Sequence, residues 1–395
     1  MTVAVIRLMR ALLLSFFVVA GALAYWQVIQ APQLVVRADN PRLVQAERQI
    51  QRGRLLDRSG MVLAYSAPEH GPGNVPVFHR HYPETATAHL VGYYSLRYGT
   101  GGCEAVFDSI LRGKRNRLEE LLHRPQRGED VMLSADLTAM RIADTELGDH
   151  IGTFIALDIA SGALLAMVSH PSYEPNRLDE TWEDLIADPS APLLNRATQG
   201  IYPVGDLARW IGLAGLLSAG ITTPSRPSEV SLAVLLAPLS RMGYVATAHQ
   251  LGFTQTPPIA LPASSGRLPS FDGRTTERDL AVTPLHMARF AAAVAGDGQM
   301  PVPVLQHSTE LAGMERVFSE NVAHTLRALT PAYDGIASWI GVALPVETGR
   351  ASLTWLVGYA PATHPQVAFA LVLEDEENRS AAMSIARRTM AALLP

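Results

Sequence analysis

Apolar residues occur along this chain in one long run and in several short ones, and each pattern predicts a different element. The long run, residues 11–31, contains no charged side chain and follows two arginines, Arg7 and Arg10. About 20 consecutive apolar residues can cross a bilayer, and basic residues ahead of them favour a cytoplasmic N-terminus. We therefore predict a cytoplasmic tail at 1–10 and a membrane anchor at 11–31.

A cleaved signal peptide is the alternative for this run. Ala22-Leu23-Ala24 has the small residues of a cleavage site. The apolar run continues beyond that site through Val28 and Ile29, which favours an anchor that is retained. Under both interpretations the rest of the chain is exported.

Short apolar runs that alternate or reverse at turn residues predict antiparallel strands. Residues 51–66 read as two strands about a turn at 57–60, because an Asp-x-x-Gly arrangement suits a chain reversal. Residues 153–169 hold two apolar strands around a turn at 160–162, and a further apolar strand follows at 366–373. An antiparallel sheet is therefore predicted to begin near residue 153.

A change in composition at 148–152 marks the predicted boundary between two domains. Residues 32–150 are rich in Arg, Gly and Pro and have only short apolar runs, whereas residues 151–395 hold longer periodic ones. A chain of 395 residues is long enough to bury a sizeable core. We therefore predict two domains after the anchor.

Apolar residues at helical spacing predict three helices in the second domain. One begins at Asp206, after a turn set by Pro203 and Gly205. A second, at 283–298, has an amphipathic pattern closed by glycine, and a third, at 378–394, ends the chain.

Composition narrows the classes of function. The net charge of −5 gives no sign of nucleic-acid binding, and a single cysteine, Cys103, excludes an intramolecular disulfide framework and a cysteine-rich metal site. His79, His81 and His89 lie close in sequence, but Glu84 is the lone carboxylate nearby. Because this does not complete a ligand set, we predict exposed loop histidines and no metal or cofactor.

The stretch 194–220, LNRATQGIYPVGDLARWIGLAGLLSAG, holds the main candidate chemistry. It resembles the LNRA-x(4)-YPPGS-x-x-K segment of penicillin-binding transpeptidases, in which the serine is acylated and the lysine activates it. In this chain Asp206 stands at the serine position and Arg209 at the lysine position. The frame of the motif is present without its two reacting groups.

The region before 150 resembles the non-catalytic domain of class B penicillin-binding proteins. Residues 51–66, QRGRLLDRSGMVLAYS, are similar to its RG-x-I-x-DR-x-G-x-x-LA signature. Residues 80–113 resemble the YP…GYYS-x-RYG…G-x-E segment of the PbpA-like branch, and 170–176 the SxPSYDPN stretch that follows. The resemblance implies an α+β fold: a penicillin-binding transpeptidase-like domain, with an antiparallel sheet flanked by helices, on a small extended pedestal with one transmembrane helix.

Two further motifs of the family are degenerate in this sequence. The resemblance places the Ser-x-Asn motif at Val230, Ser231 and Leu232, and the Lys-Thr-Gly motif at Glu347, Thr348 and Gly349, followed by Arg350. His286 lies on the helix that packs behind the sheet in this family, where we expect a surface or packing role.

These replacements argue against acyl transfer. An acyl-enzyme needs a hydroxyl or thiol beside a group that can accept its proton. Asp206 forms no stable ester, and Arg209 stays protonated. The only lysine in the chain, Lys114, lies far upstream, and Glu347 would repel the carboxylate of a substrate or β-lactam.

Three hypotheses for the function remain open. The first is a pseudoenzyme of cell-wall synthesis, in division or elongation, that binds a SEDS-type membrane glycosyltransferase, as the resemblance implies for the pedestal and the anchor. The second is a D,D-transpeptidase that uses a displaced nucleophile, Ser218, Thr222 or Thr348. The third is a sensor of stem peptides or anions, in which Arg209 and Arg350 hold a carboxylate.

The replaced residues are also expected to meet in space. In the family fold the helix start that carries Asp206 faces the strand assigned to Glu347. We therefore predict a partly buried ion pair between Arg209 and either Glu347 or Asp206, which would close the groove to substrate.

Overall fold

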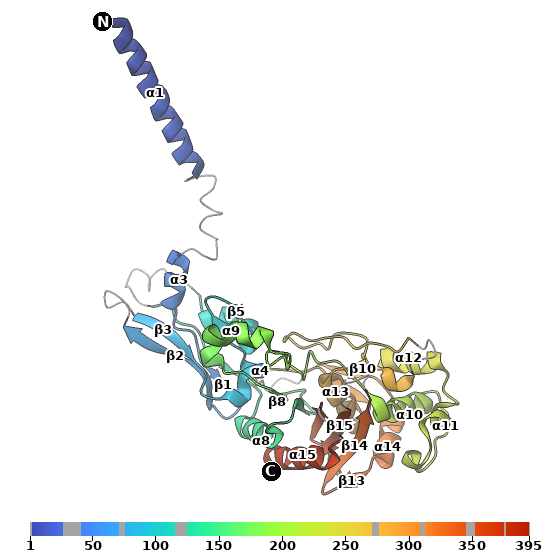
Figure 1. Cartoon of the computed structure of the whole chain (residues 1–395). Helices are drawn as coiled ribbons and strands as arrows, with labels where there is room; N and C mark the ends of the chain where they lie inside the picture. Colours follow the sequence, from blue (N-terminus) through green and yellow to red (C-terminus); the bar gives the residue numbers. More distant parts are fainter. Residues whose placement is uncertain are drawn as a thin grey trace. The chain divides into compact units, whose positions relative to one another are not determined.

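The computed structural model describes most of the chain (Figure 1). The described residues are 2–26, 41–70, 76–114, 125–270, 276–308, 313–344, 352–374 and 377–394. They form two compact units. The first comprises Met1–Gln51, Pro68–His79 and Arg115–Gln126, and the second Arg52–Ala67, Arg80–Lys114 and Arg127–Pro395. The domain boundary at 150 lies inside the second unit and stays a prediction.

The first unit begins with the apolar helix α1 (Thr2–Ala24), followed by the short helix α3 (Pro41–Arg48). Within α1, the 20-residue stretch Val5–Ala24 is apolar enough to cross a membrane, and none of it is buried. At 1.5 Å per residue it spans about 30 Å. The helix starts earlier than the predicted anchor, so Arg7 and Arg10 lie within it, and residues 27–31 of that anchor are outside the described residues.

The pedestal sheet has the strand order β3-β2-β1-β6, in which β1 pairs antiparallel with β2 and parallel with β6. Its strands are β1 (Leu55–Leu56), β2 (Val62–His70), β3 (Pro76–His81) and β6 (Val131–Met132). The predicted reversal at 57–60 is confirmed, since the backbone N–H of Asp57 donates to Met61 across the turn.

Short elements complete this part of the second unit. They are η3 (Thr85–Thr87), α4 (Ala88–Val91), β4 (Tyr94–Ser95), β5 (Gly99–Thr100), α5 (Gly102–Val106) and α6 (Asp108–Arg112). Behind them, the guanidinium of Arg52 bonds the carboxylates of Glu104 at 2.8 Å and of Asp108 at 2.6 Å. This buried ion pair fixes the start of the pedestal sheet to α5 and α6.

A six-stranded antiparallel sheet forms the centre of the second unit, in the order β13-β14-β15-β16-β7-β8. Its strands are β7 (Gly152–Asp158), β8 (Leu164–His170), β13 (Ala332–Tyr333), β14 (Ile336–Ala343), β15 (Leu353–Ala360) and β16 (Val367–Leu373). The hairpin predicted at 153–169 and the strand at 366–373 are confirmed. Strands β15 and β16 are buried along their whole length, as expected for strands in the middle of a covered sheet.

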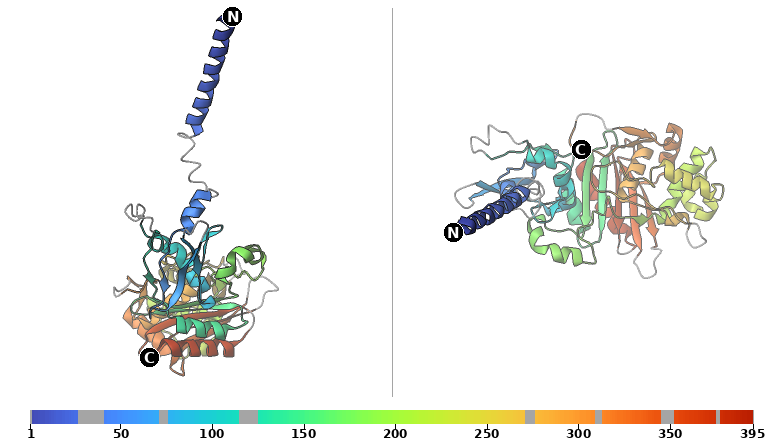
Figure 2. Two further views of the ribbon diagram at one scale, coloured as in Figure 1. Left: turned by 90° about the vertical axis from the view of Figure 1, so that its left-hand side faces the viewer. Right: turned by 90° about the horizontal axis from the view of Figure 1, so that it is seen from above.

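Helices cover both faces of this sheet (Figures 1 and 2). On one face lie α8 (Leu137–Leu147) and α15 (Arg379–Leu393), and on the other lies α13 (Pro284–Ala295). The helix α14 (Glu320–Leu329) packs beside α13, and α10 (Ala208–Ser218) packs beside α14. The closing helix predicted at 378–394 is confirmed. The helix predicted at 283–298 is confirmed as α13, but its predicted amphipathic character is wrong. Every residue of α13 is buried, because the sheet covers one side of it and α14 and β11 cover others.

The remaining elements surround these layers. They are η4 (Pro175–Arg177), α9 (Leu178–Ala187), β9 (Tyr202–Pro203), η5 (Gly205–Leu207), η6 (Pro227–Glu229), α11 (Leu232–Leu236), α12 (Arg241–Gln250), η7 (Glu277–Asp279), β10 (Ala281–Val282), β11 (Gln299–Pro301) and β12 (Met314–Arg316).

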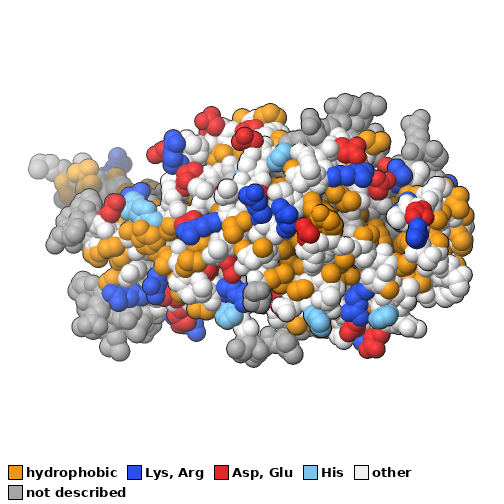
Figure 3. All heavy atoms as spheres, turned by 90° about the horizontal axis from the view of Figure 1, so that it is seen from below, with side chains coloured by type: hydrophobic (Ala, Val, Ile, Leu, Met, Phe, Trp, Pro, Cys, Tyr) orange, Lys and Arg blue, Asp and Glu red, His pale blue; other side chains and the backbone are white. Residues whose placement is uncertain are grey.

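Basic and acidic side chains are interspersed with apolar ones on the face shown in Figure 3. Within the described part of that face they form no continuous basic patch, in keeping with the composition.

Candidate functional site

Asp206 lies in a tight turn between β9 and α10. The turn is η5, and α10 begins after it at Ala208, so the predicted helix start at Asp206 is two residues early. Gly205 has a φ of +54°, and a Cβ there would come within 2.3 Å of the carbonyl oxygen of Val342. A glycine is therefore required at 205, because the turn packs directly against β14.

The Asp206 carboxylate has two partners outside its own turn. Its Oδ2 accepts a hydrogen bond from the backbone N–H of Val342 at 3.3 Å, and its Oδ1 pairs with Nη2 of Arg278 at 3.2 Å. Arg278 reaches the site because β10, which follows η7, pairs antiparallel with β9. The side chains of Asp206 and Arg278 are 40% and 51% exposed, so this ion pair is at the surface.

Arg209 makes different contacts from those predicted. Its Nη1 donates to the carbonyl oxygens of Pro227 and, at 2.6 Å, of Val230. The ion pair predicted between Arg209 and Asp206 is not formed: the carbonyls of the η6 loop bind the guanidinium, and Arg278 takes the carboxylate. Burial lowers the pKa of Arg209 from its ordinary value, but a guanidinium remains a cation at neutral pH.

The residues assigned to the Ser-x-Asn motif, Val230, Ser231 and Leu232, lie beside Arg209. The carbonyl of Val230 binds its guanidinium, and Leu232 begins α11. Ser231 precedes α11 at the N-cap position, yet its side chain makes no capping hydrogen bond there. Asp206, Arg209 and Val230 are thus brought to one place, as the resemblance implied.

The strand that faces Asp206 is β14. A Cβ added at Gly341 would lie 3.1 Å from the Cβ of Asp206, so strand and turn touch. Glu347, Thr348, Gly349 and Arg350 lie outside the described residues, and the predicted pair of Arg209 with Glu347 therefore stays a prediction. The strand β14 is not predicted from the sequence, although residues 336–343 are a largely apolar run with one glycine, and the strand pairs antiparallel with β15.

Two indole rings fill the space between α10 and β14. Trp210 of α10 stacks on Trp339 of β14, with ring centroids 5.1 Å apart and an angle of 25° between the planes. Both side chains are buried, and Nε1 of Trp339 donates to Oγ1 of Thr330 at 3.1 Å. Directly behind the turn that carries Asp206, the fold is therefore a packed apolar core.

The LNRA segment, residues 194–197, precedes this turn and is fixed by hydrogen bonds to the sheet. Nε of Arg196 binds Oε1 of Glu374 at 2.8 Å, and the same oxygen accepts the hydroxyl of Tyr202 at 2.7 Å. Burial, with the nearby charge of Glu374, raises the pKa of Tyr202 well above its ordinary value, so its hydroxyl stays a donor. Nε1 of Trp355 donates to the carbonyl of Pro203 at 2.9 Å, which ties the segment to β15.

The described alternative nucleophiles, Ser218 and Thr222, lie away from Asp206 and Arg209. Ser218 is the last residue of α10, about 15 Å along the helix axis from the first, and Thr222 follows the helix. Thr348 is outside the described residues. Neither Ser218 nor Thr222 makes a side-chain hydrogen bond to an acid or a base in the described chain, so no activated hydroxyl is seen there.

His286 has a structural role, as predicted. Its Nδ1 accepts from the backbone N–H of Thr283 and its Nε2 faces the carbonyl of Gln255 at 2.9 Å, so the ring caps α13. Burial lowers the pKa of His286 to about 4, which keeps the ring neutral.

The prediction of exposed loop histidines is wrong for His89, and it holds only in part for His79, which is exposed but lies on a strand. His89 is buried in α4 with its Nε2 2.9 Å from the carbonyl of Pro192, and burial lowers its pKa to about 4. His79 and His81 lie on the strand β3, where His79 contacts Glu69 at 3.1 Å. The described residues contain no group of three or more His, Cys, Asp or Glu placed to hold a metal.

Comparisons with known proteins agree with this architecture. The family model of the penicillin binding protein A dimerisation domain matches residues 52–125. The peptidoglycan D,D-transpeptidase PbpA of Mycolicibacterium smegmatis is 30% identical over 466 aligned residues, which cover 93% of this chain and 94% of the relative. This alignment is longer than the chain itself, so the relative has segments that this protein lacks.

Solved structures of one relative superpose over the same extent. The crystal structure of PBPA from Mycobacterium tuberculosis has a TM-score of 0.77 at 25% identity, over 88% of this chain and 100% of that chain. Its penicillin G acyl-enzyme complex gives a TM-score of 0.78 at 26% identity, over 88% and 100%. The chain is a homologue of proteins of peptidoglycan synthesis, and it belongs to the class B penicillin-binding proteins, with their dimerisation domain and transpeptidase fold.

Proposed function

We propose that this protein is a non-catalytic class B penicillin-binding protein that acts in peptidoglycan synthesis by binding, as a scaffold or regulator of a SEDS-type membrane glycosyltransferase. The observation that carries the proposal is the Asp206 carboxylate, which stands at the turn before α10 bonded to Val342 and Arg278. A carboxylate there offers no hydroxyl to be acylated.

The surroundings of Asp206 lack a proton acceptor of the required kind. Arg209 is a permanent cation that binds two carbonyl groups, and the chain has no lysine other than Lys114. A transpeptidase must both attack a carbonyl and return a proton to the leaving amine. The described residues around Asp206 supply neither function.

The facing strand supports the same conclusion. In the family, the Lys-Thr-Gly strand faces the reacting serine and leads into the W-F-x-G-Y strand. Here β14 faces Asp206 and pairs with β15, so Trp339, Ile340 and Gly341 are a second candidate for that motif beside Glu347, Thr348 and Gly349. Neither triplet contains a lysine, and Trp339 is buried against Trp210.

The edge of β14 is also partly occupied. A ligand that added to this edge would need its backbone N–H groups, and the N–H of Val342 is already bonded to Asp206. The Asp206–Arg278 pair covers the same position. Productive binding of a stem peptide would therefore have to displace a carboxylate of this chain.

A scaffold needs only the parts that the chain retains. The apolar helix α1 is long enough to anchor the protein in one pass, which we place with the N-terminus in the cytoplasm and the bulk of the chain outside. The pedestal sequence matches its family model over 52–125. The relatives are named D,D-transpeptidases, so an active D,D-transpeptidase is the alternative function. Labelling with penicillin distinguishes the two.

The test is labelling of the full-length protein in detergent with penicillin G, followed by intact-protein mass spectrometry. We expect no covalent adduct, whereas PbpA of Mycolicibacterium smegmatis under the same conditions should be labelled. A stoichiometric adduct on this protein would overturn the proposal. Co-purification of the native protein with a SEDS-type glycosyltransferase from its own membranes tests the scaffold role, and its absence would count against that part alone.

A further inference from the structure

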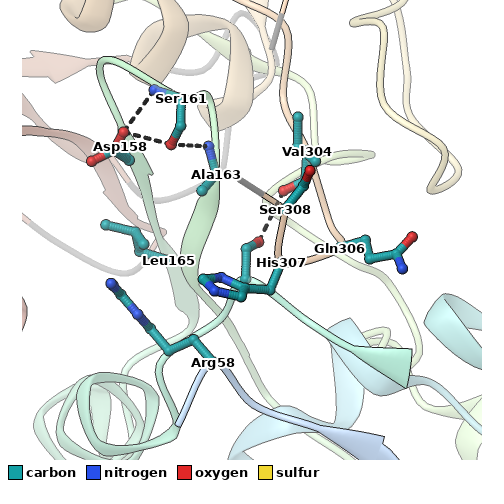
Figure 4. A pocket seen from close by; sticks show the side chains of 10 residues that line it. Arg58, Asp158, Ser161, Ala163, Leu165, Val304, Gln306, His307 and Ser308 are labelled. Atoms are coloured by element: carbon teal, nitrogen blue, oxygen red, sulfur yellow. Dashed lines mark hydrogen bonds between the residues drawn. The ribbon is translucent and has the colours of Figure 1, made fainter. Parts of the chain in front are cut away.

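A small cavity lies away from Asp206, where four segments of the second unit meet (Figure 4). Its volume is about 100 Å³. It is lined by the turn between β1 and β2, by the segment between β6 and α8, by the β7–β8 hairpin and by the extended segment after β11. The lining residues are Arg58, Ser134, Asp158, Ser161, Ala163, Leu165, Val304, Gln306, His307 and Ser308.

One end of the cavity is cationic. Arg58 and His307 lie side by side there, and their side chains make no ion pair or hydrogen bond with any other described residue (Figure 4). Hydrogen bonds fix the backbone at both positions, since Arg58 N–H donates to the carbonyl of Ala135 and His307 N–H to that of Met132, while both side chains are exposed. An arginine held beside a cavity without a partner is suited to a carboxylate, which it can bind through two parallel hydrogen bonds.

The opposite end is anionic. The Oδ1 of Asp158 accepts from the backbone N–H of Ser161 at 2.7 Å and from its hydroxyl at 2.6 Å. These bonds hold the carboxylate in place within the β7–β8 turn (Figure 4). Its Oδ2 accepts no hydrogen bond from the residues that the structure describes, so a ligand donor can approach it.

The middle of the cavity is apolar. Leu165 lies between the two charged ends in Figure 4, and Ala163 and Val304 line the wall beside it. The space exceeds what one water molecule occupies in the liquid, about 30 Å³. A ligand that bridges the two ends would carry both signs of charge and a small apolar group.

We propose that this cavity binds a free amino acid with a small side chain, such as alanine, as its zwitterion. The α-carboxylate faces Arg58 and His307, the α-ammonium faces Oδ2 of Asp158, and the methyl group rests against Leu165. An anion alone would leave Asp158 unpaired, and a cation alone would leave Arg58 unpaired. No bond is made or broken, and the site is independent of the proposed function of the Asp206 region.

Binding here would join segments that the fold already brings together. The extended segment donates to and accepts from the β7–β8 hairpin through Val304, while His307 bonds the end of β6. A ligand held at both ends would add a connection between the Arg58 turn and the hairpin. Amino-acid binding is thus expected to stabilise this part of the second unit.

The test is calorimetric titration of the full-length protein in detergent with alanine, acetate and methylammonium. For so small a ligand we expect an alanine Kd of about 1 mM, and weaker binding of both single-charge probes. Arg58→Gln and Asp158→Asn should each weaken alanine binding by at least about fivefold. Asp158→Asn keeps the oxygen that accepts from Ser161, so the turn is preserved.

Arg177→Gln is the matched control, because Arg177 is an exposed arginine of the same unit whose side chain pairs, among the described residues, with Glu180. It should leave the alanine Kd unchanged. The proposal is overturned by the absence of saturable alanine binding to the wild type, by acetate binding as tightly as alanine, or by unchanged binding in the Arg58 and Asp158 variants. Circular dichroism of each variant checks that a loss of binding is not a loss of fold.

Discussion

Asp206 and Val342 are joined by a hydrogen bond from strand to turn: the backbone N–H of Val342 donates to the Asp206 carboxylate at 3.3 Å. The two residues come from η5 and β14, which touch: a Cβ at Gly205 would lie 2.3 Å from the carbonyl oxygen of Val342, and one at Gly341 would lie 3.1 Å from the Cβ of Asp206. The carboxylate thus closes against the strand edge that faces it. The contact between turn and strand is part of the fold. A change at Asp206 alone would therefore leave Arg209 and Trp339, which also prevent acylation, in place.

Asp206→Ser is expected to remain unlabelled by penicillin G. The variant gains a hydroxyl, but Arg209 beside it still cannot accept the proton, and Trp339 still fills the space behind the turn. Intact-protein mass spectrometry gives the readout, with Asp206→Asn as the matched variant that has no hydroxyl. An adduct on the serine variant and none on the asparagine variant would show that the remaining site is competent.

Asp57→Ala should strongly destabilise the second unit. The buried Asp57 carboxylate accepts from the N–H and hydroxyl of Ser59 and from the N–H groups of Met61 and Leu137. Each backbone donor left unsatisfied costs roughly 1–3 kcal/mol, so we expect a loss of about 2–4 kcal/mol in the free energy of unfolding. Chemical denaturation measures it.

Asp188→Ala is the control for that loss. Asp188 makes the same two bonds, to the N–H and hydroxyl of Ser190, but it is exposed. Water replaces those bonds in the variant, and little change in stability is expected. Equal losses in the two variants would mean that burial of the Asp57 turn contributes nothing.

Local patterns in the sequence predicted the parts of the fold that depend on neighbouring residues. The Asp57 turn and the β7–β8 hairpin follow from alternation and turn residues, and both were found where predicted. The prediction of an amphipathic α13 failed because periodicity shows only where the apolar residues lie. It does not show that the small side chains of this helix allow other elements to pack on every side of it.

The candidate site was harder to predict, because its contacts are between distant segments. Asp206 and Arg209 were found by their place in a motif, but Arg278 comes from a short 3₁₀ turn that no local pattern singles out. The strand β14 has none of the polar letters of the family motif. Only its pairing with β15 and its contact with Gly205 reveal that it faces Asp206.

The contribution of His170 to stability should fall as the pH rises. Burial alone lowers its pKa, but hydrogen bonds from its two ring nitrogens to Asp144 and to the carbonyl of Gly148, each 2.8 Å, with the charge of Asp144, raise the pKa overall. Arg196 opposes the charge from nearby. Since the folded-state pKa is raised, the stabilisation is fully present below the unfolded pKa and is lost as the pH passes the folded one.

His170→Gln removes this titration. The difference in unfolding free energy between wild type and His170→Gln should therefore be larger near pH 5 than near pH 9, on either side of the ordinary histidine pKa of about 6.5. Urea denaturation at several pH values measures it, with the exposed His364→Gln as control. A difference that is constant with pH would show that the pKa of His170 is the same in the folded and the unfolded chain.

Trp210 and Trp339 should be coupled in stability. Truncation of either buried indole to alanine is expected to cost about 3–5 kcal/mol, and the stacked pair should contribute a coupling of about 1 kcal/mol beyond burial. Trp182, which stacks on Tyr98 but is only half-buried, provides a control whose truncation costs less. A double-mutant cycle that gives purely additive losses would mean that the two rings fill space independently.

Two ion pairs near the site should differ in strength because they differ in exposure. Arg196 and Glu374 are 4% and 28% exposed, and Arg196 also donates to the carbonyls of Ser190 and Ala191. Glu374→Gln leaves a buried guanidinium without its counter-charge, and losing one partner of a buried pair costs about 3–5 kcal/mol. For this half-buried partner we expect the lower end of that range.

The pair of Asp206 with Arg278 should be weak by comparison. Both side chains are close to half exposed, and exposed pairs contribute about 0–1 kcal/mol. Thermal denaturation of Asp206→Asn, Arg278→Gln and the double variant closes the cycle, and high salt should reduce the coupling further. A coupling as large as that of Arg196 with Glu374 would contradict this expectation. A small coupling would mean that the packing of the turn against β14 positions Asp206. Arg278 could then be removed with little loss of stability.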